Sequence, residues 1–453
     1  MAREQLARVS FVPPRVVAPH KPLNRLAFVA RFVRNPLAVV PRAAYEEDIV
    51  FLPGAPIAWV TGPALVKTIL LDEREKFEKR AQIRLLAPLL GKGILTSEGA
   101  DWKWQRQAAA PMFRQHELAG FVPAFVAATR RCIAGWRDGD TRPIERDMTQ
   151  LTFDVIAATL LPSADPRMPG AIEASTGLFQ RSGAWGQLYA VANLPKWLPQ
   201  PGRAGMAKAV RALRGATLAI VRERRAAAAA KDDLLARLMG ARDPETGRQM
   251  NDEQLVDNLL TFYLAGHETT AKALTWTLYL LARSPQWTAR LEQEIAQVAG
   301  GAAIGAAHIE RLVLTQQVLK EAMRLYPPVP LMTRQAVADA VLGGHAVKAG
   351  TSLVMPIYAI HRHARRWEDP DAFDPGRFAP AREASIPRYQ YMPFGAGPRI
   401  CIGMAFAMNE AAAILATLLQ HARFAPTAHE PAPVARVTLV PRGGMPLAVR
   451  LRR

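Results

Sequence analysis

A single long helix is predicted from about Asp252 to about Arg283, and it restricts the chain to folds large enough to surround it. Asn251 is a favourable N-cap with Gln254 at the capping-box position, and a Ser-Pro pair ends the stretch. At about 1.5 Å per residue the helix would cross a whole domain. Its middle reads AGHETT at 265–270, where a glycine, a carboxylate and two hydroxyls interrupt an apolar pattern. We therefore expect polar chemistry halfway along this helix.

The rest of the chain predicts a mainly α fold with small β-sheets. Residues 48–62 read as a hairpin with a Pro-Gly turn, and residues 341–356 as a second strand pair. A helix is predicted from about Ile309 to Leu325. Half of the residues are apolar, so a large core is expected. The length allows one large or several smaller domains, and nothing marks a repeat or a linker.

One of the two cysteines, Cys401, lies in an unusual turn, FGAGPRICIG at 394–403. Gly395 and Gly397 permit backbone conformations that other residues avoid, so successive N–H groups can point at one atom. A helix is predicted directly after Cys401, and its positive end favours an anionic sulfur. The turn therefore predicts a thiolate.

A thiolate in this turn has three possible roles: nucleophile, zinc ligand or axial iron ligand. No cluster of Cys, His or carboxylate residues with zinc-ligand spacing accompanies Cys401. The sequence singles out no base or oxyanion site for a Cys-His hydrolase. A heme iron needs only one protein thiolate.

The cysteines and the apolar segments of the sequence indicate the cellular compartment in which the protein is expected. Two cysteines cannot form a disulfide framework, and Cys132 lies in an amphipathic stretch where a buried thiol is expected, so a reducing, cytoplasmic location is predicted. The apolar run at 26–40 is interrupted by arginines and does not read as a secretory signal. Residues 400–422 contain Glu410 and read as a buried core helix, so no integral membrane anchor is expected.

The formal net charge is +19, from 58 basic and 39 acidic residues. No nucleic-acid-binding motif accompanies this charge, and no nucleic-acid partner is expected. An acidic protein partner would be complementary to such a surface.

Five motifs together resemble the cytochrome P-450 superfamily, in its soluble bacterial type. The FGAGPRICIG turn is similar to the heme-binding signature and AGHETT to the oxygen-activating helix motif. EAMR at 321–324, FDPGRF at 373–378 and WKWQR at 102–106 resemble the ExxR, meander and WxxxR motifs, in family order. The resemblance implies the P-450 fold, with heme b buried between the long helix and the helix after Cys401, and dioxygen as co-substrate. It also implies one heme domain over 1–453, with about 1–40 as an N-terminal segment and no fused reductase domain.

The resemblance also implies a role for each matching residue. Cys401 would be the axial ligand of the heme iron. Arg106, Arg334 and Arg399, with the indole N–H of Trp102, would hold the propionates. Phe394 and Gly403 would pack beside the sulfur. An ion-pair network of Glu321, Arg324 and Arg377 would support the fold.

The long helix would supply the catalytic groups and part of the substrate pocket. Ala265 and Gly266 would leave space over the iron, Thr269 would donate to the reacting oxygen, and Glu268 would relay protons from solvent. A mid-helix threonine can instead bond back to the preceding turn. Four residues are expected to border the distal cavity: Leu264, Ala265, Val329 and Leu331. Residues 83–95 and 184–199 would form its roof, with Arg84 or Arg181 as possible carboxylate ligands.

The resemblance therefore predicts a monomeric monooxygenase that hydroxylates or epoxidises a lipophilic small molecule. The chain ends 52 residues after Cys401, so electrons are expected from a separate ferredoxin or flavodoxin with its reductase. Two alternatives are a heme-thiolate isomerase or peroxygenase, and a non-catalytic heme-binding protein. The Glu268–Thr269 pair favours reductive oxygen activation over both.

Overall fold

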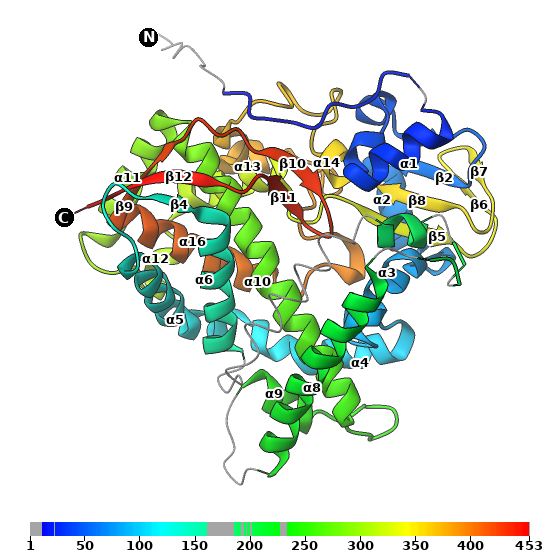
Figure 1. Cartoon of the computed structure of the whole chain (residues 1–453), viewed down its shortest axis with the longest axis horizontal. Helices are drawn as coiled ribbons and strands as arrows, with labels where there is room; N and C mark the ends of the chain where they lie inside the picture. The colour runs from blue at the N-terminus through cyan, green and yellow to red at the C-terminus, as the bar shows by residue number, and fades with distance from the viewer. Residues whose placement is uncertain are drawn as a thin grey trace.

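The computed structural model describes residues 11–21, 23–160, 185–191, 194–195, 197–199, 202–226 and 233–452. In this part of the chain most strands lie on one side, helices lie on both sides, and α10 passes through the centre (Figure 1). The helices are α1 Arg25–Arg34, α2 Pro63–Lys67, α3 Arg80–Leu90, α4 Gly99–Ala109, α5 Gln115–Ala134, α6 Ile144–Thr159, α8 Arg203–Ala226, α9 Leu234–Gly240, α10 Asp252–Ala282, α11 Pro285–Ala299, α12 Ala306–Ile309, α13 Val313–Leu325, α14 Ile357–Ile360, α15 Pro380–Glu383 and α16 Met404–His421.

The strands form one sheet of five strands and three smaller sheets. The large sheet has the order β1-β2-β8-β5-β3, in which only β2 and β8 are parallel. The strands are β1 Ile49–Phe51, β2 Ile57–Val60, β3 Phe77–Glu78, β4 Thr141–Pro143, β5 Met332–Ala336, β6 Ala340–Leu342, β7 His345–Val347, β8 Ser352–Met355, β9 Ala422–Pro426, β10 Ala432–Ala435, β11 Leu439–Arg442 and β12 Pro446–Leu451.

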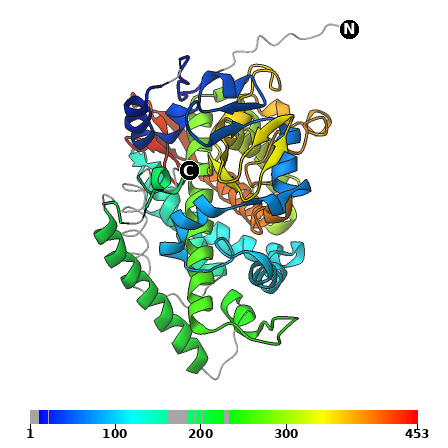
Figure 2. The ribbon, with the colours of Figure 1, turned by 90° about the vertical axis from the view of Figure 1, so that its right-hand side faces the viewer.

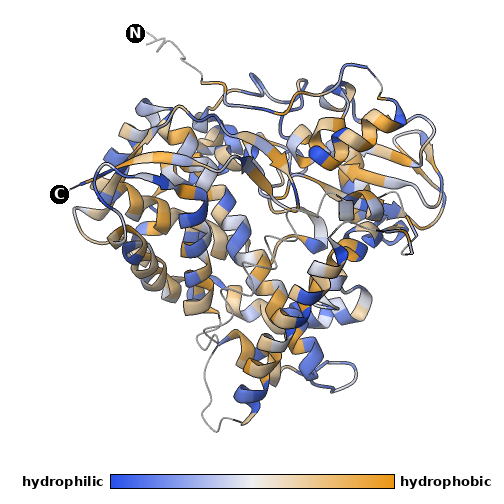
Figure 3. Ribbon diagram, viewed as in Figure 1, coloured by the Kyte–Doolittle hydropathy of each residue, from blue (hydrophilic) through white to orange (hydrophobic). Residues whose placement is uncertain are grey.

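Helix α10 confirms the long helix that the sequence predicts. Asn251 accepts from the Gln254 N–H (2.8 Å), and the Gln254 side chain accepts from the Asn251 N–H (3.1 Å), which completes the capping box. Most of its side chains are buried, because α6, α8, α13 and α16 all pack against it. Figure 3 shows the largely hydrophobic α16 close to α10. The largest hydrophobic core surrounds this helix.

The two predicted hairpin regions are also confirmed. β1 pairs with β2 across the Pro-Gly turn, and β6 pairs with β7 across Gly343-Gly344. β8 then leaves the second hairpin and joins the large sheet beside β2. This arrangement places Arg334, which pairs with Leu353 in the β5–β8 register, inside the sheet.

The predicted helix from Ile309 to Leu325 is wrong at its start, since α12 ends at Ile309 and α13 begins at Val313. The Glu294 carboxylate on α11 accepts from the backbone N–H groups of Leu314 and Thr315 at 2.5 and 2.9 Å. This side chain satisfies the free N–H groups of the new helix, which can therefore start at that point.

Two further expectations from the sequence concern Cys132 and the helix after Cys401. Cys132, expected to be buried, is half-buried on α5. Residues 404–421 form the buried core helix α16, and no helix of the described residues is both long and apolar enough to cross a membrane.

Candidate functional site

The Cys401 turn has the backbone geometry that its glycines predict. Gly395 and Gly397 have φ values of +73° and +70°, which side chains disfavour. A Cβ on Gly397 would lie 2.4 Å from the Leu70 carbonyl oxygen, so this glycine is also required for close packing. The Cys401 N–H donates to the Phe394 carbonyl oxygen (3.0 Å) and closes the turn. A Cβ on Gly403 would lie 4.0 Å from the Cys401 sulfur, which places Gly403 beside it.

The groups around Cys401 act on its sulfur in opposite directions. Burial raises the pKa of the Cys401 thiol above its ordinary value, while the Gly403 N–H and the Arg106 charge oppose this rise. Cys401 nevertheless has accessible surface. A metal ion bound to this sulfur would favour the deprotonated form, so the thiolate stays a prediction.

An accessible patch interrupts α10 in the middle of its buried length. Leu264, Gly266 and Thr269 are half-buried and Ala265 is exposed, whereas the turns before and after are buried. The Phe113 ring stacks with Phe262 of α10 at 5.9 Å and also lies against Gly403. Phe113 therefore connects α10, close to its accessible patch, with the Cys401 turn.

Gly266 lies where α10 packs against α6, and its expected role in leaving space over the iron stays a prediction. A Cβ there would lie 2.8 Å from Cδ1 of Ile156 on α6. The residue whose exposure matches that expectation is Ala265.

Thr269 of the patch and the adjacent Glu268 both make hydrogen bonds within the protein. The Thr269 hydroxyl donates to the Ala265 carbonyl oxygen (2.7 Å), the bond to the preceding turn that mid-helix threonines commonly make. Its oxygen can still accept a hydrogen bond. Glu268 is buried and accepts from the Thr438 hydroxyl (2.8 Å), so it is not itself a solvent-exposed acid. His267 is buried and its ring contacts Phe153, away from the patch.

A group of cations, which we call the cation cluster, consists of the buried Lys79 and Arg334 and the half-buried Arg399, with Glu98 as its carboxylate. Arg399 pairs with Glu98, and the Lys79 Nζ lies 3.9 Å from the same carboxylate. Lys79 also donates to the Leu95 carbonyl oxygen (2.7 Å). Among the described residues, Nη1 of Arg399 is buried without a hydrogen-bond partner. Three cations share one carboxylate, so this site is suited to additional anionic groups.

The pKa values of the cluster reflect the same excess of positive charge. Burial, with repulsion from Arg399, lowers the pKa of Lys79 to about 7. Burial lowers the pKa of Arg334 to about 10. A bound dianion would oppose both shifts. The sequence did not indicate Lys79 or Glu98, because neither belongs to a motif and both join the site through the fold.

Trp102 and Arg106 connect the cation cluster to the Cys401 turn. The Arg399 guanidinium lies 3.8 Å from the Trp102 ring centroid, and that of Arg106 lies 5.9 Å from it. Arg106 donates through Nη1 to the Ile400 carbonyl oxygen (2.9 Å), directly before Cys401. The structure thus brings together the cofactor-binding residues that the sequence predicts.

The structure also brings together Glu321, Arg324 and Arg377. Glu321 and Arg324 are fully buried and form a bidentate pair at 2.7 and 2.8 Å. Arg324 also donates to the carbonyl oxygens of His361, Pro370 and Ala372, and Arg377 lies 3.5 Å from Glu321. The network ties α13 to the segment before the Cys401 turn.

The residues expected around the substrate have accessible surface on two elements. Leu264 and Ala265 lie on α10, while Val329 is 36% exposed and Leu331 half-buried in the loop between α13 and β5. Arg181 and part of the expected 184–199 roof lie outside the described residues. Arg84, on α3, is half-buried.

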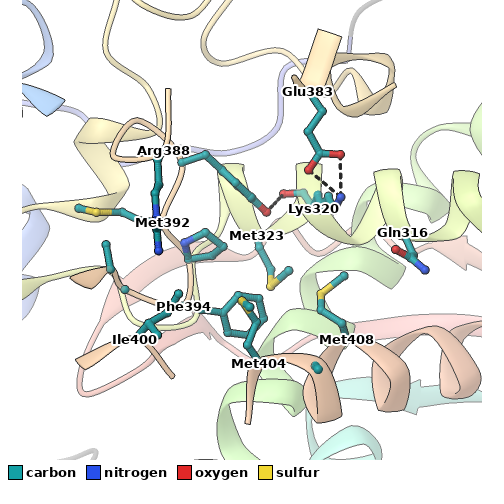
Figure 4. Close-up of a pocket in the computed structure, with 15 residues that line it drawn as sticks. Gln316, Lys320, Met323, Glu383, Arg388, Met392, Phe394, Ile400, Met404 and Met408 are labelled. Atoms are coloured by element: carbon teal, nitrogen blue, oxygen red, sulfur yellow. Dashed lines mark hydrogen bonds and ion pairs between the residues drawn. The ribbon is translucent and has the colours of Figure 1, made fainter. Parts of the chain in front are cut away.

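A pocket of about 330 Å³ lies beside the Cys401 turn. Methionines from α13 and α16 line it with Phe394, and the Lys320–Glu383 ion pair (2.7 Å) spans its edge (Figure 4). Its further lining includes Arg388, an exposed cation, and Met404, which is 40% exposed. We call this the methionine pocket.

Comparison with known proteins decides among the remaining chemistries. A family model described as Cytochrome P450 matches residues 49–445. The chain belongs to the cytochrome P450 family. It is 33% identical to cyclooctat-9-en-7-ol 5-monooxygenase of Streptomyces melanosporofaciens over 80% of this chain and 79% of that protein. It is 33% identical to 11-oxo-beta-amyrin 30-oxidase of Glycyrrhiza uralensis over 87% and 78%.

The P450 fold is shown by a solved structure as well. The crystal structure of the cytochrome P450DA heme domain matches with a TM-score of 0.82 and 26% identity, over 97% of this chain and 99% of that one. This P450 is therefore a heme monooxygenase that uses heme b and dioxygen. The residues present fit that cofactor, because an accessible cysteine sulfur and a cation cluster with an unpartnered guanidinium N–H suit an iron porphyrin with two propionates.

Proposed function

We propose that this P450 inserts one oxygen atom from dioxygen into a C–H or C=C bond of a terpenoid-like lipophilic molecule. The second oxygen atom leaves as water, with two electrons from a separate ferredoxin or flavodoxin and two protons. The observation that carries the proposal is the accessible, mostly apolar patch of Leu264, Ala265 and Gly266 beside Thr269. Relatives named for oxidation of cyclooctat-9-en-7-ol and 11-oxo-beta-amyrin support a largely hydrocarbon substrate.

The residues around the heme have distinct proposed roles. Cys401 would hold the heme iron through its sulfur, and the heme would supply the chemistry that activates dioxygen. Lys79, Arg334 and Arg399 would hold the propionates, with Trp102 and Arg106 beside them. Phe394 and Gly403 pack by the sulfur and exclude water from it.

Thr269 and Glu268, both on α10, are the proposed proton-transfer residues. The Thr269 hydroxyl, held by the Ala265 carbonyl, presents its oxygen toward the accessible patch and can pass a proton by rotation. Glu268 exchanges protons through the Thr438 hydroxyl that it contacts. Proton delivery at the right position keeps electron flow coupled to product formation.

The methionine pocket is the proposed docking place of the electron donor. It lies next to Phe394 and the Cys401 turn, so a donor seated there has a short path to the iron. Arg388 on its edge and the net charge of +19 suit an acidic donor.

The proposed substrate class is tested by screening cyclic terpenoids against matched linear fatty acids for the absorbance change that follows displacement of iron-bound water. We expect the terpenoids to produce this change at lower concentration, because a rigid hydrocarbon loses less freedom on binding. Heavy-isotope dioxygen should then label the product. Label from peroxide only, or turnover without reductant, would favour a peroxygenase or an isomerase instead.

The proton role of Thr269 is tested with Thr269→Ala. Substrate binding should persist, while reductant is diverted to hydrogen peroxide and the yield of oxidised product per reductant falls by about tenfold or more. Thr275→Ala is the matched control, because the Thr275 hydroxyl makes the same bond to the preceding turn (2.7 Å). Equal uncoupling in both variants, or tight coupling in Thr269→Ala, would contradict the role.

A further inference from the structure

Glu268 points toward the turn between β10 and β11, residues 435–439, which we call the hairpin turn. Its Oε1 atom accepts from the Thr438 hydroxyl at 2.8 Å, and both side chains are buried. Burial makes such a donor important, because a carboxylate inside the protein loses the hydrogen bonds of water. The two residues are 170 positions apart in the sequence, so only the fold brings them together.

The ionisable neighbours of Glu268 on α10 point in another direction. Lys272, one turn later, extends its Nζ to Glu145 on α6 (2.9 Å). His267 is buried with its ring against Phe153, which also lies on α6. Glu268 therefore faces the hairpin turn while these neighbours face α6.

The hairpin turn is held on both of its strands. The Asn35 side-chain amide bonds to the backbone of β10 through its nitrogen and its oxygen, at 3.0 Å each. On β11, the Leu439 carbonyl oxygen accepts from the Trp276 indole N–H of α10 (3.0 Å), and the Leu439 N–H donates to the Pro328 carbonyl oxygen (2.9 Å). In Figure 2 the red strands near the C-terminus lie beside the dark blue N-terminal helices, in agreement with the Asn35 contact. These bonds fix the place of the Thr438 hydroxyl.

The hairpin turn also contacts part of the expected roof of the distal cavity. The helical residues 185–191, which we call the roof segment, belong to that expected roof. Gln187 of this segment donates through its side-chain amide to the Arg436 carbonyl oxygen. The Ser352 hydroxyl on β8 donates to the Val191 carbonyl oxygen (3.1 Å) and ties the end of the segment to the large sheet. The hairpin turn thus lies between the roof segment and Glu268.

We infer that the hairpin turn makes proton delivery depend on the position of the roof segment. Thr438 is the positioning residue, because its hydroxyl sets the direction of the Glu268 carboxylate beside Thr269. Gln187 is the link, so a substrate that shifts the roof segment also shifts Glu268 through two hydrogen bonds. A proton donor works only within hydrogen-bond reach of its acceptor, which makes this position important. The inference rests on the proton role proposed above for Glu268 and Thr269.

Thr438→Val tests the positioning role in the heme-loaded protein, because valine has a similar shape and lacks the hydroxyl. Substrate binding should persist, while the yield of oxidised product per reductant falls by about threefold to tenfold. Thr438→Ser should restore the yield, because it returns the donor. Thr417→Val on α16 is the matched control, since Thr417 is also buried and donates to the preceding turn (2.7 Å), and it should leave the yield unchanged.

Two measurements distinguish positioning from a purely structural role. The solvent deuterium isotope effect on product formation should rise in Thr438→Val and return to its original value in Thr438→Ser. A crystal structure of Thr438→Val should show the Glu268 carboxylate turned away from the hairpin turn, with the fold unchanged. A Glu268 carboxylate that keeps its place would overturn the inference.

Gln187→Leu tests the link to the roof segment. We expect a smaller fall in yield than in Thr438→Val, and no additional fall when Gln187→Leu is added to Thr438→Val, because the path is already interrupted. Additive effects of the two substitutions would overturn the link.

The outcomes also separate this inference from the function on which it rests. Tight coupling in Thr438→Val together with uncoupling in Thr269→Ala would overturn the inference alone. Tight coupling in Thr269→Ala would overturn the proton role itself, and the inference with it.

Discussion

The two cysteines occupy different surroundings, and the difference gives a sharp prediction at the scale of single residues. Cys401→His should abolish the red-shifted Soret band that a thiolate ligand gives the reduced carbonyl complex, because only an iron–sulfur bond produces it. Cys132→Ser is the control: burial raises the pKa of the Cys132 thiol to about 12, so it is not available as a thiolate. An unchanged band in Cys401→His would refute the ligand assignment.

Glu410 on α16 is a buried carboxyl group whose Oε1 has no hydrogen-bond partner among the described residues. Burial raises its pKa from an ordinary 4.5 to about 8, although a hydrogen bond from Thr270 opposes the shift. Between these two values the unfolded chain releases the proton while the folded chain keeps it. The folded state therefore binds more protons, and its stability falls as the pH rises through this range.

Replacement of this carboxyl group by an amide should remove that dependence. Glu410→Gln should flatten the decline of the thermal midpoint between pH 5 and 8 (roughly the window set by the two pKa values), where the slope is at most about 1.4 kcal/mol per pH unit. Thermal unfolding of the heme-loaded protein at several pH values measures this. Glu253→Gln, on an exposed residue of α10 (79%), is the control. A Glu410→Gln profile parallel to that of the unchanged protein would show that Glu410 is already ionised in the fold.

At the scale of elements, α13 takes part in two ion pairs whose burial differs. The Glu321–Arg324 pair is fully buried, whereas Lys320 and Glu383 are 25% and 37% exposed. Glu321→Gln should lower the free energy of unfolding by about 3–5 kcal/mol, because Arg324 then remains buried without its carboxylate. Lys320→Met should cost only about 0–1 kcal/mol. Thermal unfolding and heme content measure both, and similar losses would mean that burial does not set the importance of the pair.

The elements also show how far the sequence can be interpreted. The start of α10 is predictable because the groups that cap it are local side chains, Asn251 and Gln254. The start of α13 is not, because its cap is Glu294 from another helix. Lys79 reaches the site only through the packing of α3 and β5, so no motif marks it. The close packing at Gly266 is not predictable either, because the side chain that a Cβ there would approach is Ile156, more than a hundred residues away in the sequence.

At the scale of the whole molecule, the net charge alone could not indicate where a charged partner binds, because it carries no information about position. The fold supplies that information for one cation, since Arg388 lies on the edge of the largely apolar methionine pocket, beside the Cys401 turn.

Donor docking at the methionine pocket can be tested by reversing one charge there. Arg388→Glu should raise the KM for an acidic ferredoxin several-fold, while substrate binding and the spectrum of the heme remain unchanged, because the residue is exposed and touches neither. Arg222→Glu, on an exposed position of α8, makes the same change in net charge away from the pocket and should leave this KM unaltered. The dependence of turnover on ionic strength should weaken only in Arg388→Glu, since the lost attraction is local. Equal effects of the two variants would mean that the donor responds to net charge rather than to this pocket.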